Sequence, residues 1–460
     1  MAAKTPRAGM KNDFDVAIVG GGAAGVLLAL RLLHDARAGQ RIALIEPDVP
    51  GRGAAYATED PAHLLNVPAG NMGADSDAPG DFVDFLRARD GDADPTAFRP
   101  RRDYADYLQA RLRQAREASA VEFRHLRARA VHIQWTGSHA VIHLDARAGV
   151  DATLHSRRVV LATGNQPRTL AADNAHPRIL SAWQNGALER IAEDDDIAIL
   201  GSGLSMVDAL LSLDARGHRG RVVAISRHGL LPLAHPDHRQ TLAFDTHALE
   251  ALPLRRRLRV MRETARRAAA DGIGWQALMD ALRHHGRALW QSLGAVEQRR
   301  FLRHAVRHWD VHRHRVAPQV ARLLQRDLDR GRLERVAARV HAIDGGDGRV
   351  ALMLHERGTQ QPRMLAVDWL VNATGIETRA AAFTDPLLRQ LLADGLARPG
   401  PHGLGFDCAA DGAVLAADGR AQPWLCAIGS LRLGNLWEST AIPDLRVDAA
   451  MLAPRLLAAA

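Results

Sequence analysis

The chain has 460 residues, of which 47% are hydrophobic and 24% charged, a composition typical of a soluble globular protein with two or three domains. Its formal net charge of +8 suggests an anionic partner, but aromatic residues make up only 4%, which leaves little surface for stacking nucleic-acid bases. We therefore expect small molecules and not nucleic acid as partners. No apolar run reaches membrane length and residues 1–15 lack the apolar core of a signal peptide, so we expect a cytoplasmic protein.

A glycine-rich turn near the N-terminus follows an apolar strand predicted at 16–19 and precedes a helix predicted at 23–33. Its glycines have the G-x-G-x-x-G spacing of a dinucleotide-binding turn. Gly20 permits the tight turn, Gly22 lets the backbone approach a pyrophosphate, and Gly25 lets the helix pack closely on the strand. The helix N-terminus supplies free N–H groups for the phosphates. We predict that this turn binds a dinucleotide.

The next strand, predicted at 41–45, ends in Glu46, which lies 21 residues after the last glycine of the turn. A carboxylate at this point accepts hydrogen bonds from ribose hydroxyls and repels a 2′-phosphate. Loops at 51–56 and 63–72 follow, and if the dinucleotide is a flavin, as the second turn described next suggests, we expect these loops to lie over it. Asn66 in the second loop either bonds the flavin or bonds its own backbone.

A second glycine turn follows an apolar strand predicted at 197–200. Gly201 and Gly203 keep the spacing, whereas Met206 replaces the third glycine and is expected to hold the helix slightly further from the strand. Two such turns in one chain suggest two dinucleotides that exchange a hydride, a flavin and a nicotinamide. The chain has no C-x-x-C pair, so we do not expect the electrons to continue to a disulfide.

The strand after the second turn, predicted at 222–225, ends in Ser226 and Arg227, with no acidic residue at this point. A serine and an arginine can accept a 2′-phosphate, so the residues favour NADPH, while NADH stays open. The alternative is a surface arginine on an ordinary β-α-β unit.

Two runs in different parts of the chain, 159–164 and 370–375, are strand-like and end in Ala-Thr-Gly. This places Gly164 and Gly375 where the chain is expected to cross between domains. Between the two runs, residues 246–302 combine many arginines with helical apolar spacing. We expect a helical insertion that caps the active site, mediates a homodimer, or forms a layer with a solvated arginine face.

Arg313, His314 and Arg315 form a dense basic cluster together with His312, after this insertion. These side chains either hold an anionic substrate or the nicotinamide phosphates, or they form a solvated charged face. His235 and His238 have no obvious third ligand near them, so no metal site is expected.

Near the C-terminus, a strand that ends at Gly429 and Ser430 precedes a helix predicted from about Ile442, whose N–H groups can point at a flavin. The two cysteines, Cys408 and Cys426, are 18 residues apart and have no metal-binding spacing. We expect both to pack as small apolar residues in a reducing compartment.

These motifs resemble those of flavoproteins with two dinucleotide-binding domains, which distantly include flavin-containing and N-hydroxylating monooxygenases, and most of all a bacterial group of FAD/NAD(P)-binding proteins. The resemblance spans nearly the whole chain. Within that group, the length and the arginine-rich insertion are similar to those of the bacterial FAD-dependent urate hydroxylase. Two features depart from relatives: Ser430 stands where Asp is usual, and the F-x-G-x-x-x-H signature of ketone-oxidising monooxygenases is absent.

The resemblance implies an α/β fold with two Rossmann-like dinucleotide-binding domains. Residues 1–165 and 376–460 would form the FAD domain, and residues 166–375 the NAD(P)H domain with its helical insertion at about 246–302. The cofactor-binding positions implied by the motifs and the resemblance are Gly20, Gly22, Ala24, Gly25, Glu46, Gly164, Gly201, Gly203, Ser226, Arg227, Gly375, Gly429 and Ser430.

The activity implied is that of a monooxygenase that uses FAD, NADH or NADPH, and O2 to hydroxylate a small molecule through a flavin C4a-hydroperoxide. Its most specific form converts urate to 5-hydroxyisourate in purine degradation. The side chains expected on the substrate are Asn66, Arg313, His314 and Arg315. The alternatives are an N-hydroxylase of an amine, a general flavin-dependent NAD(P)H oxidoreductase, and a non-catalytic FAD-binding redox sensor.

Overall fold

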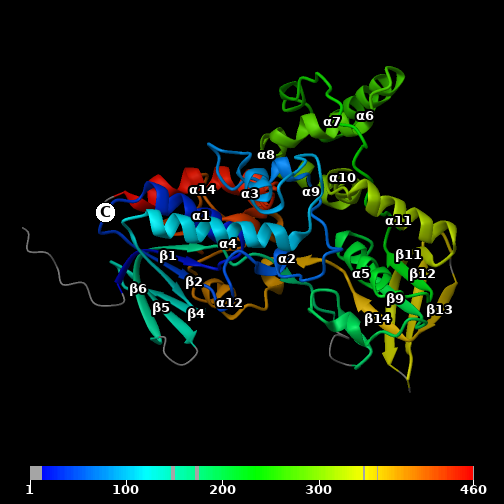
Figure 1. The fold of residues 1–460 in the computed structure, drawn as a ribbon, viewed down its shortest axis with the longest axis horizontal. Coiled ribbons are helices and arrows are strands. Elements are labelled where there is room, and N and C mark those ends of the chain that lie inside the picture. The colour runs from blue at the N-terminus through cyan, green and yellow to red at the C-terminus, as the bar shows by residue number, and fades with distance from the viewer. Residues whose placement is uncertain (1–12, 147–150, 171–175, 346–347, 360, 459–460) are drawn as a thin grey trace, which may run out of the picture.

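The computed structural model describes residues 13–146, 151–170, 176–345, 348–359 and 361–458. Two sheets lie side by side, and helices stand above the region where they meet (Figure 1). The prediction that residues 1–15 are not a signal peptide concerns mainly residues 1–12, which lie outside the described part of the chain. Among the described helices, none combines the length and the hydrophobicity of a membrane-spanning segment.

The first sheet has eight strands, in the order β16-β17-β6-β1-β2-β3, and β5 joins β4 to β6. The central strand β1 pairs in parallel with both β2 and β6. These strands come from two distant parts of the chain: β1 Asp13–Val19, β2 Arg41–Ile45, β3 Glu122–Leu126, β4 Ala128–Trp135, β5 Ala140–Ala146, β6 Thr153–Leu161, β16 Ala413–Leu415 and β17 Ala421–Ala427.

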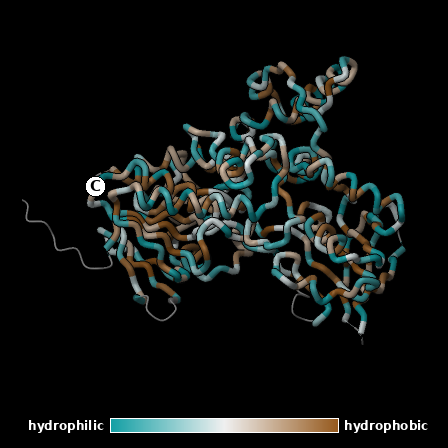
Figure 2. Tube along the Cα trace, in the orientation of Figure 1, coloured by the Kyte–Doolittle hydropathy of each residue, from teal (hydrophilic) through white to brown (hydrophobic). Residues whose placement is uncertain are grey.

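Both faces of the first sheet are covered, which explains why β1 is apolar at consecutive positions. Val16 and Ile18 point into a core with α1, α3, α4 and α14, while Ala17 and Val19 point into a second core with β4, β5 and α12. In Figure 2 the brown, hydrophobic segments gather in the interior of the first sheet and its helices, and the teal, hydrophilic segments lie mainly on the outside. The bounds of these helices are α1 Ala23–Asp35, α3 Asp81–Asp90, α4 Arg101–Ala118, α12 Pro386–Ala393 and α14 Ile442–Leu457.

The second sheet has seven strands, in the order β13-β12-β11-β10-β9-β14-β8, with β8, β14, β9, β10 and β11 parallel. Its strands are β8 Ile179–Ser181, β9 Ile197–Leu200, β10 Val222–Ser226, β11 Leu333–Gly345, β12 Val350–Glu356, β13 Pro362–Val367 and β14 Trp369–Asn372. Two helices, α5 (Leu204–Ala215) and α11 (Pro318–Asp329), pack their apolar sides on one face of it. The strands and helices predicted around the second turn are confirmed.

Two short strands mark where the chain passes between the sheets. These are β7 (Gln166–Pro167) and β15 (Ile376–Glu377), which pair antiparallel. The N–H of Arg168 also donates to the carbonyl of Gly375 over 2.9 Å. Both crossings therefore lie side by side, directly after the Ala-Thr-Gly runs, as the sequence predicted.

The helical insertion is longer than the sequence indicated. Its end was expected near residue 302, but helices continue to Arg313 because Val306 and Trp309 pack in the same apolar cluster as Phe301. Its helices are α6 Leu254–Ala270, α7 Trp275–Leu282, α8 Gly286–Gln291, α9 Ala295–His304 and α10 Val306–Arg313. In Figure 1, α6 and α7 project away from both sheets, and α8 lies close to α14.

Candidate functional site

The first glycine turn joins β1 to α1 and is tightly enclosed on one side. A Cβ on Gly25 would lie 1.9 Å from the carbonyl oxygen of Gly20, and a Cβ on Gly20 would lie 2.3 Å from that of Ala162. Gly20 also has φ +103°, a conformation that glycine adopts without strain. By contrast, a Cβ on Gly22 would approach only the Cα of Gly53, at 3.7 Å. The open side of the turn is thus the side that a pyrophosphate would approach.

The carboxylate of Glu46 lies against this turn. One oxygen accepts the N–H of Gly21 over 2.7 Å and the other accepts the N–H of Asp48 over 3.1 Å. The loop that follows returns to the turn as well, since the N–H of Gly51 donates to Gly21 O over 2.8 Å. The acid at the end of β2 is therefore held beside the glycines, as a ribose-binding residue requires.

Gly429, which follows the C-terminal strand β17, lies against the same turn. A Cβ on Gly429 would lie 3.6 Å from that of Ala24, at the first turn of α1. The hydroxyl of Ser430 donates to the carbonyl of Gly164 over 2.7 Å. Ser430, the departure from the usual aspartate, thus ties the end of β17 to the crossing after β6.

The second turn repeats the first in three dimensions. Gly201 has φ +107°, and a Cβ on it would lie 2.2 Å from Ala373 O, as Gly20 packs on Ala162 O. Around Gly203 no atom lies within 4 Å of a built Cβ, so this turn is open as well. The alanine carbonyl of each Ala-Thr-Gly run therefore packs against the first glycine of one turn, a contact that the sequence did not predict.

At the end of β10, Ser226 and Arg227 have different environments. The hydroxyl of Ser226 accepts from Ser202 Oγ over 2.8 Å and from Gly229 N–H over 3.0 Å, so it closes the turn. Arg227 is exposed, and its pKa is lowered by partial burial and by nearby Arg307, Arg168 and Arg339. This accumulation of positive charge beside the second turn suits an additional phosphate.

The predicted substrate residues lie in the loop at 63–72 and at the end of α10, the last helix of the insertion. The carbonyl of Asn66 accepts Nε2–H of His235 over 2.9 Å, and burial followed by nearby Arg315 lowers the pKa of His235 to about 4. Asn66 also borders a small cavity with Leu204 and Val207 of α5. The loop at 63–72 therefore lies against the second domain as well as the first.

The three residues of the basic cluster separate into different environments. Arg313 forms a bidentate pair with Glu438, at 3.2 and 3.0 Å, in which the two side chains are only 9% and 8% exposed. Burial lowers the pKa of His314. Arg315 is buried and pairs with Asp280. Arg313, predicted to hold an anion, is thus already neutralised by the carboxylate of Glu438, which lies shortly before α14.

The base of the insertion is clamped onto the first domain. Arg287 of α8 holds the fully buried carboxylate of Asp448 in α14 through two hydrogen bonds of 2.6 and 3.0 Å. Trp290 Nε1 donates to Gly434 O over 3.0 Å. A Cβ on Gly286 would lie 2.6 Å from the side chain of Glu438. The insertion therefore packs on the C-terminal part of the first domain through α8.

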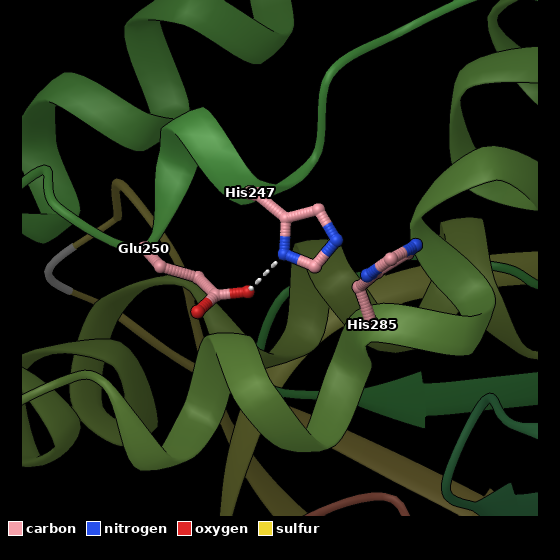
Figure 3. Close-up of side chains that lie close together, drawn as sticks. All are labelled: His247, Glu250 and His285. Atoms are coloured by element: carbon pink, nitrogen blue, oxygen red, sulfur yellow. Dashed lines mark hydrogen bonds and ion pairs between the residues drawn. The ribbon is translucent and has the colours of Figure 1, made fainter.

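One cluster of potential metal ligands occurs among the described residues (Figure 3). His247, Glu250 and His285 place their donor atoms within 4.8 Å of one another. His247 Nδ1 and a Glu250 oxygen are 3.1 Å apart, and the two imidazole rings meet edge to face at 4.9 Å. This set of donors is one that Zn²⁺ accepts. The side chain of His247 is largely exposed, and neither His235 nor His238 belongs to the cluster.

The fold with its two glycine turns is that of flavoproteins with two dinucleotide-binding domains. Residues 17–166 match the model of a FAD-NAD(P)-binding family. No curated protein matches the chain.

Several solved structures share the fold over almost the whole chain. The ornithine N-hydroxylase of Kutzneria sp. 744, with reduced FAD, NADP+ and L-ornithine, has a TM-score of 0.66 at 18% identity, covering 96% of this chain and 99% of that one. L-lysine 6-monooxygenase from Pseudomonas syringae has 0.61 at 18%, with 96% and 99% covered. The cadaverine monooxygenase of Erwinia amylovora has 0.60 at 15%, with 97% and 95% covered. At these identities the likeness establishes the fold.

Proposed function

We propose that this chain is a flavin-dependent monooxygenase that consumes NADPH and O2 and hydroxylates the nitrogen of an amine. The observation that carries the proposal is the correspondence of its fold, over 95–99% of their chains, with enzymes that act on ornithine, lysine and cadaverine. Urate hydroxylation, the more specific expectation from the sequence, has no comparable support. Hydroxylation of an amine, one of the alternatives named from the sequence, is therefore the better supported function.

The cysteines support an oxygenase over a disulfide reductase, a class that also has this fold. Cys408 and Cys426 are both buried and free, and burial raises the pKa of the first to about 12 and of the second to about 11. Thiols in that state are poor nucleophiles. The chain thus lacks the thiolate that disulfide exchange requires.

The residues present fit both cofactors. The open backbone at Gly22 and Gly203 would receive the two pyrophosphates, and Glu46 would hold the ribose of FAD. The chemistry that FAD supplies when bound is oxidation of NADPH and activation of O2. The protein's own contribution is to orient the two dinucleotides across the junction and, through α8 and the clamped insertion, to exclude water from it.

The proposal is tested by reconstituting the protein with FAD and following NADPH and O2 consumption with ornithine, lysine, cadaverine and urate in parallel. We expect one or more amines to stimulate NADPH oxidation and to gain one oxygen atom by mass spectrometry, with little peroxide. If urate alone is hydroxylated, amine hydroxylation is wrong and urate hydroxylation takes its place. NADPH consumption that yields only peroxide with every compound would refute both.

Arg227 is expected to determine the preference for NADPH. Because a charge-assisted bond to a phosphate contributes about 1.5–3 kcal/mol, Arg227→Ala should raise KM for NADPH by about ten-fold or more. KM for NADH should change little, since NADH has no 2′-phosphate. Arg255→Ala, an exposed arginine on α6, is the matched control. Equal loss with both coenzymes would show that Arg227 does not contact the 2′-phosphate.

A further inference from the structure

Three side chains of metal-binding type meet where the projecting pair of helices, α6 and α7, begins and ends. His247 and Glu250 belong to the segment before α6, and His285 ends the short 3-10 helix Arg283–His285 between α7 and α8. Their donor atoms lie within 4.8 Å of one another, and Figure 3 shows the three side chains converging from the two segments. The proposed reaction does not use any of them.

The backbone on both sides of this cluster is fixed by buried contacts. Leu249 and Leu282, each next to or within a few residues of a ligand, are buried in one apolar cluster. The buried side chain of Arg257 in α6 also joins the two segments, since it donates to the carbonyl of Glu250 over 2.8 Å and to that of Leu289 over 2.6 Å. The fold itself therefore holds the two segments together, and the three side chains are presented on a rigid support.

The spacing of the donors suits a tetrahedral ion. His247 and Glu250 are one helical turn apart, and Nδ1 of His247 lies 3.1 Å from a carboxylate oxygen of Glu250. Ligands of a tetrahedral Zn²⁺ lie about 3.3–3.6 Å from one another, given the usual lengths of Zn–N and Zn–O bonds. The ring of His285 meets that of His247 edge to face, with 4.9 Å between centroids. A small rotation of side chains, without movement of the backbone, is enough to bring the third donor into range.

The donor types select the class of metal. Two imidazoles and one carboxylate suit Zn²⁺, whereas Mg²⁺ and Ca²⁺ prefer oxygen ligands throughout. The side chain of His247 is 74% exposed, so a water molecule can reach the fourth position. The two cysteines are buried and do not compete for the ion.

We propose that His247, Glu250 and His285 bind one Zn²⁺ ion, with water as the fourth ligand, and that the ion fastens the two ends of the α6–α7 pair to each other. His285 directly precedes α8, whose Arg287 and Trp290 contact the first domain. The ion therefore strengthens the base of the insertion at the point where the insertion is attached. Because the unfolded chain does not bring these ligands together, bound Zn²⁺ stabilises the folded protein.

The test uses untagged, FAD-loaded protein from which metal has been removed with a chelator. Zn²⁺ is titrated in competition with a chromophoric chelator, and metal retained after desalting is measured by mass spectrometry. We expect one tightly bound Zn²⁺ per chain, which an excess of Mg²⁺ or Ca²⁺ does not displace. Zn²⁺ should also raise the melting temperature and slow hydrogen exchange in residues 246–290, where the ligands and the segments that they join lie.

Matched variants assign the ion to these side chains. Glu250→Gln and His247→Ala should each weaken Zn²⁺ binding by about ten-fold or more, since removal of a ligand costs at least as much as removal of a group that only orients one. Glu263→Gln on α6 and His304→Ala on α9 change exposed side chains of the same insertion and should leave the affinity unchanged. The FAD content and melting temperature of each metal-free variant establish that it is folded. If Glu250→Gln is not folded, the exposed His247→Ala variant supplies the same comparison.

The results either support this site or overturn it, and none of them depends on the proposed reaction. Loss of binding in Glu250→Gln and His247→Ala, with normal binding in both controls, would support it. Equal affinity in Glu250→Gln and Glu263→Gln would place the ion elsewhere and overturn it. The absence of stoichiometric Zn²⁺, displacement of Zn²⁺ by Mg²⁺ or Ca²⁺, or slower exchange confined to residues outside 246–290 would overturn it as well.

Discussion

Gly25→Ala is expected to abolish stable retention of FAD. The added methyl carbon would lie 1.9 Å from the carbonyl oxygen of Gly20, and that oxygen belongs to the turn itself, so α1 must move away from β1. Overpacking of this kind costs about 1–3 kcal/mol, and here it also displaces the N–H groups that would bind the pyrophosphate. The measurements are the ratio of FAD to protein after desalting and the free energy of unfolding in urea.

The matched control is Gly80→Ala, at the start of α3. Gly80 has φ −91° and no atom within 4 Å of a built Cβ, so alanine fits without strain. We expect normal FAD content and unfolding free energy within about 1 kcal/mol of the original protein, because this change alters mainly the unfolded chain. If Gly25→Ala keeps its FAD as Gly80→Ala does, the first turn is not the FAD-binding turn.

Arg287→Met is expected to release the helical insertion from the first domain. It leaves the carboxylate of Asp448 fully buried without the two hydrogen bonds that now neutralise it. Removing one partner of a buried ion pair costs about 3–5 kcal/mol. If the insertion shields the reaction from water, the same change should divert NADPH oxidation towards peroxide. Urea unfolding and the yield of peroxide per NADPH are the measurements.

Arg300→Met serves as the comparison for Arg287→Met. Arg300 lies on the same insertion and pairs with Glu297, but its side chain is 65% exposed. An exposed pair contributes about 0–1 kcal/mol, so stability and coupling should change little. Equal losses in the two variants would mean that the effect comes from removing any arginine from the insertion and not from the clamp on α14.

The predictions from the sequence agree best with the structure at the two glycine turns. Gly20, Gly22 and Gly25 act within one strand-turn-helix unit, so the apolar runs on either side predicted the strand and the helix, and the glycine spacing predicted the turn between them. Glu46 was found by the same reasoning, since its distance along the chain is set by one helix and one strand. Such features are local, and local geometry is what residue spacing can encode.

The basic cluster shows where this reasoning fails. Arg313, His314 and Arg315 are consecutive and look equivalent in the sequence. The structure separates them because Glu438 and Asp280 approach from other elements, 125 and 35 residues away.

Residue patterns along the chain thus predicted the two dinucleotide-binding units, the crossing points and the helical insertion, since each was recognised from a run of neighbouring residues. The folded chain shows which charges are neutralised and which buried donors have no partner among the described residues. It also shows that the insertion is clamped on α14 through Arg287 and Asp448. Those outcomes depend on how distant elements dock, and docking buries side chains according to the shape of the whole fold.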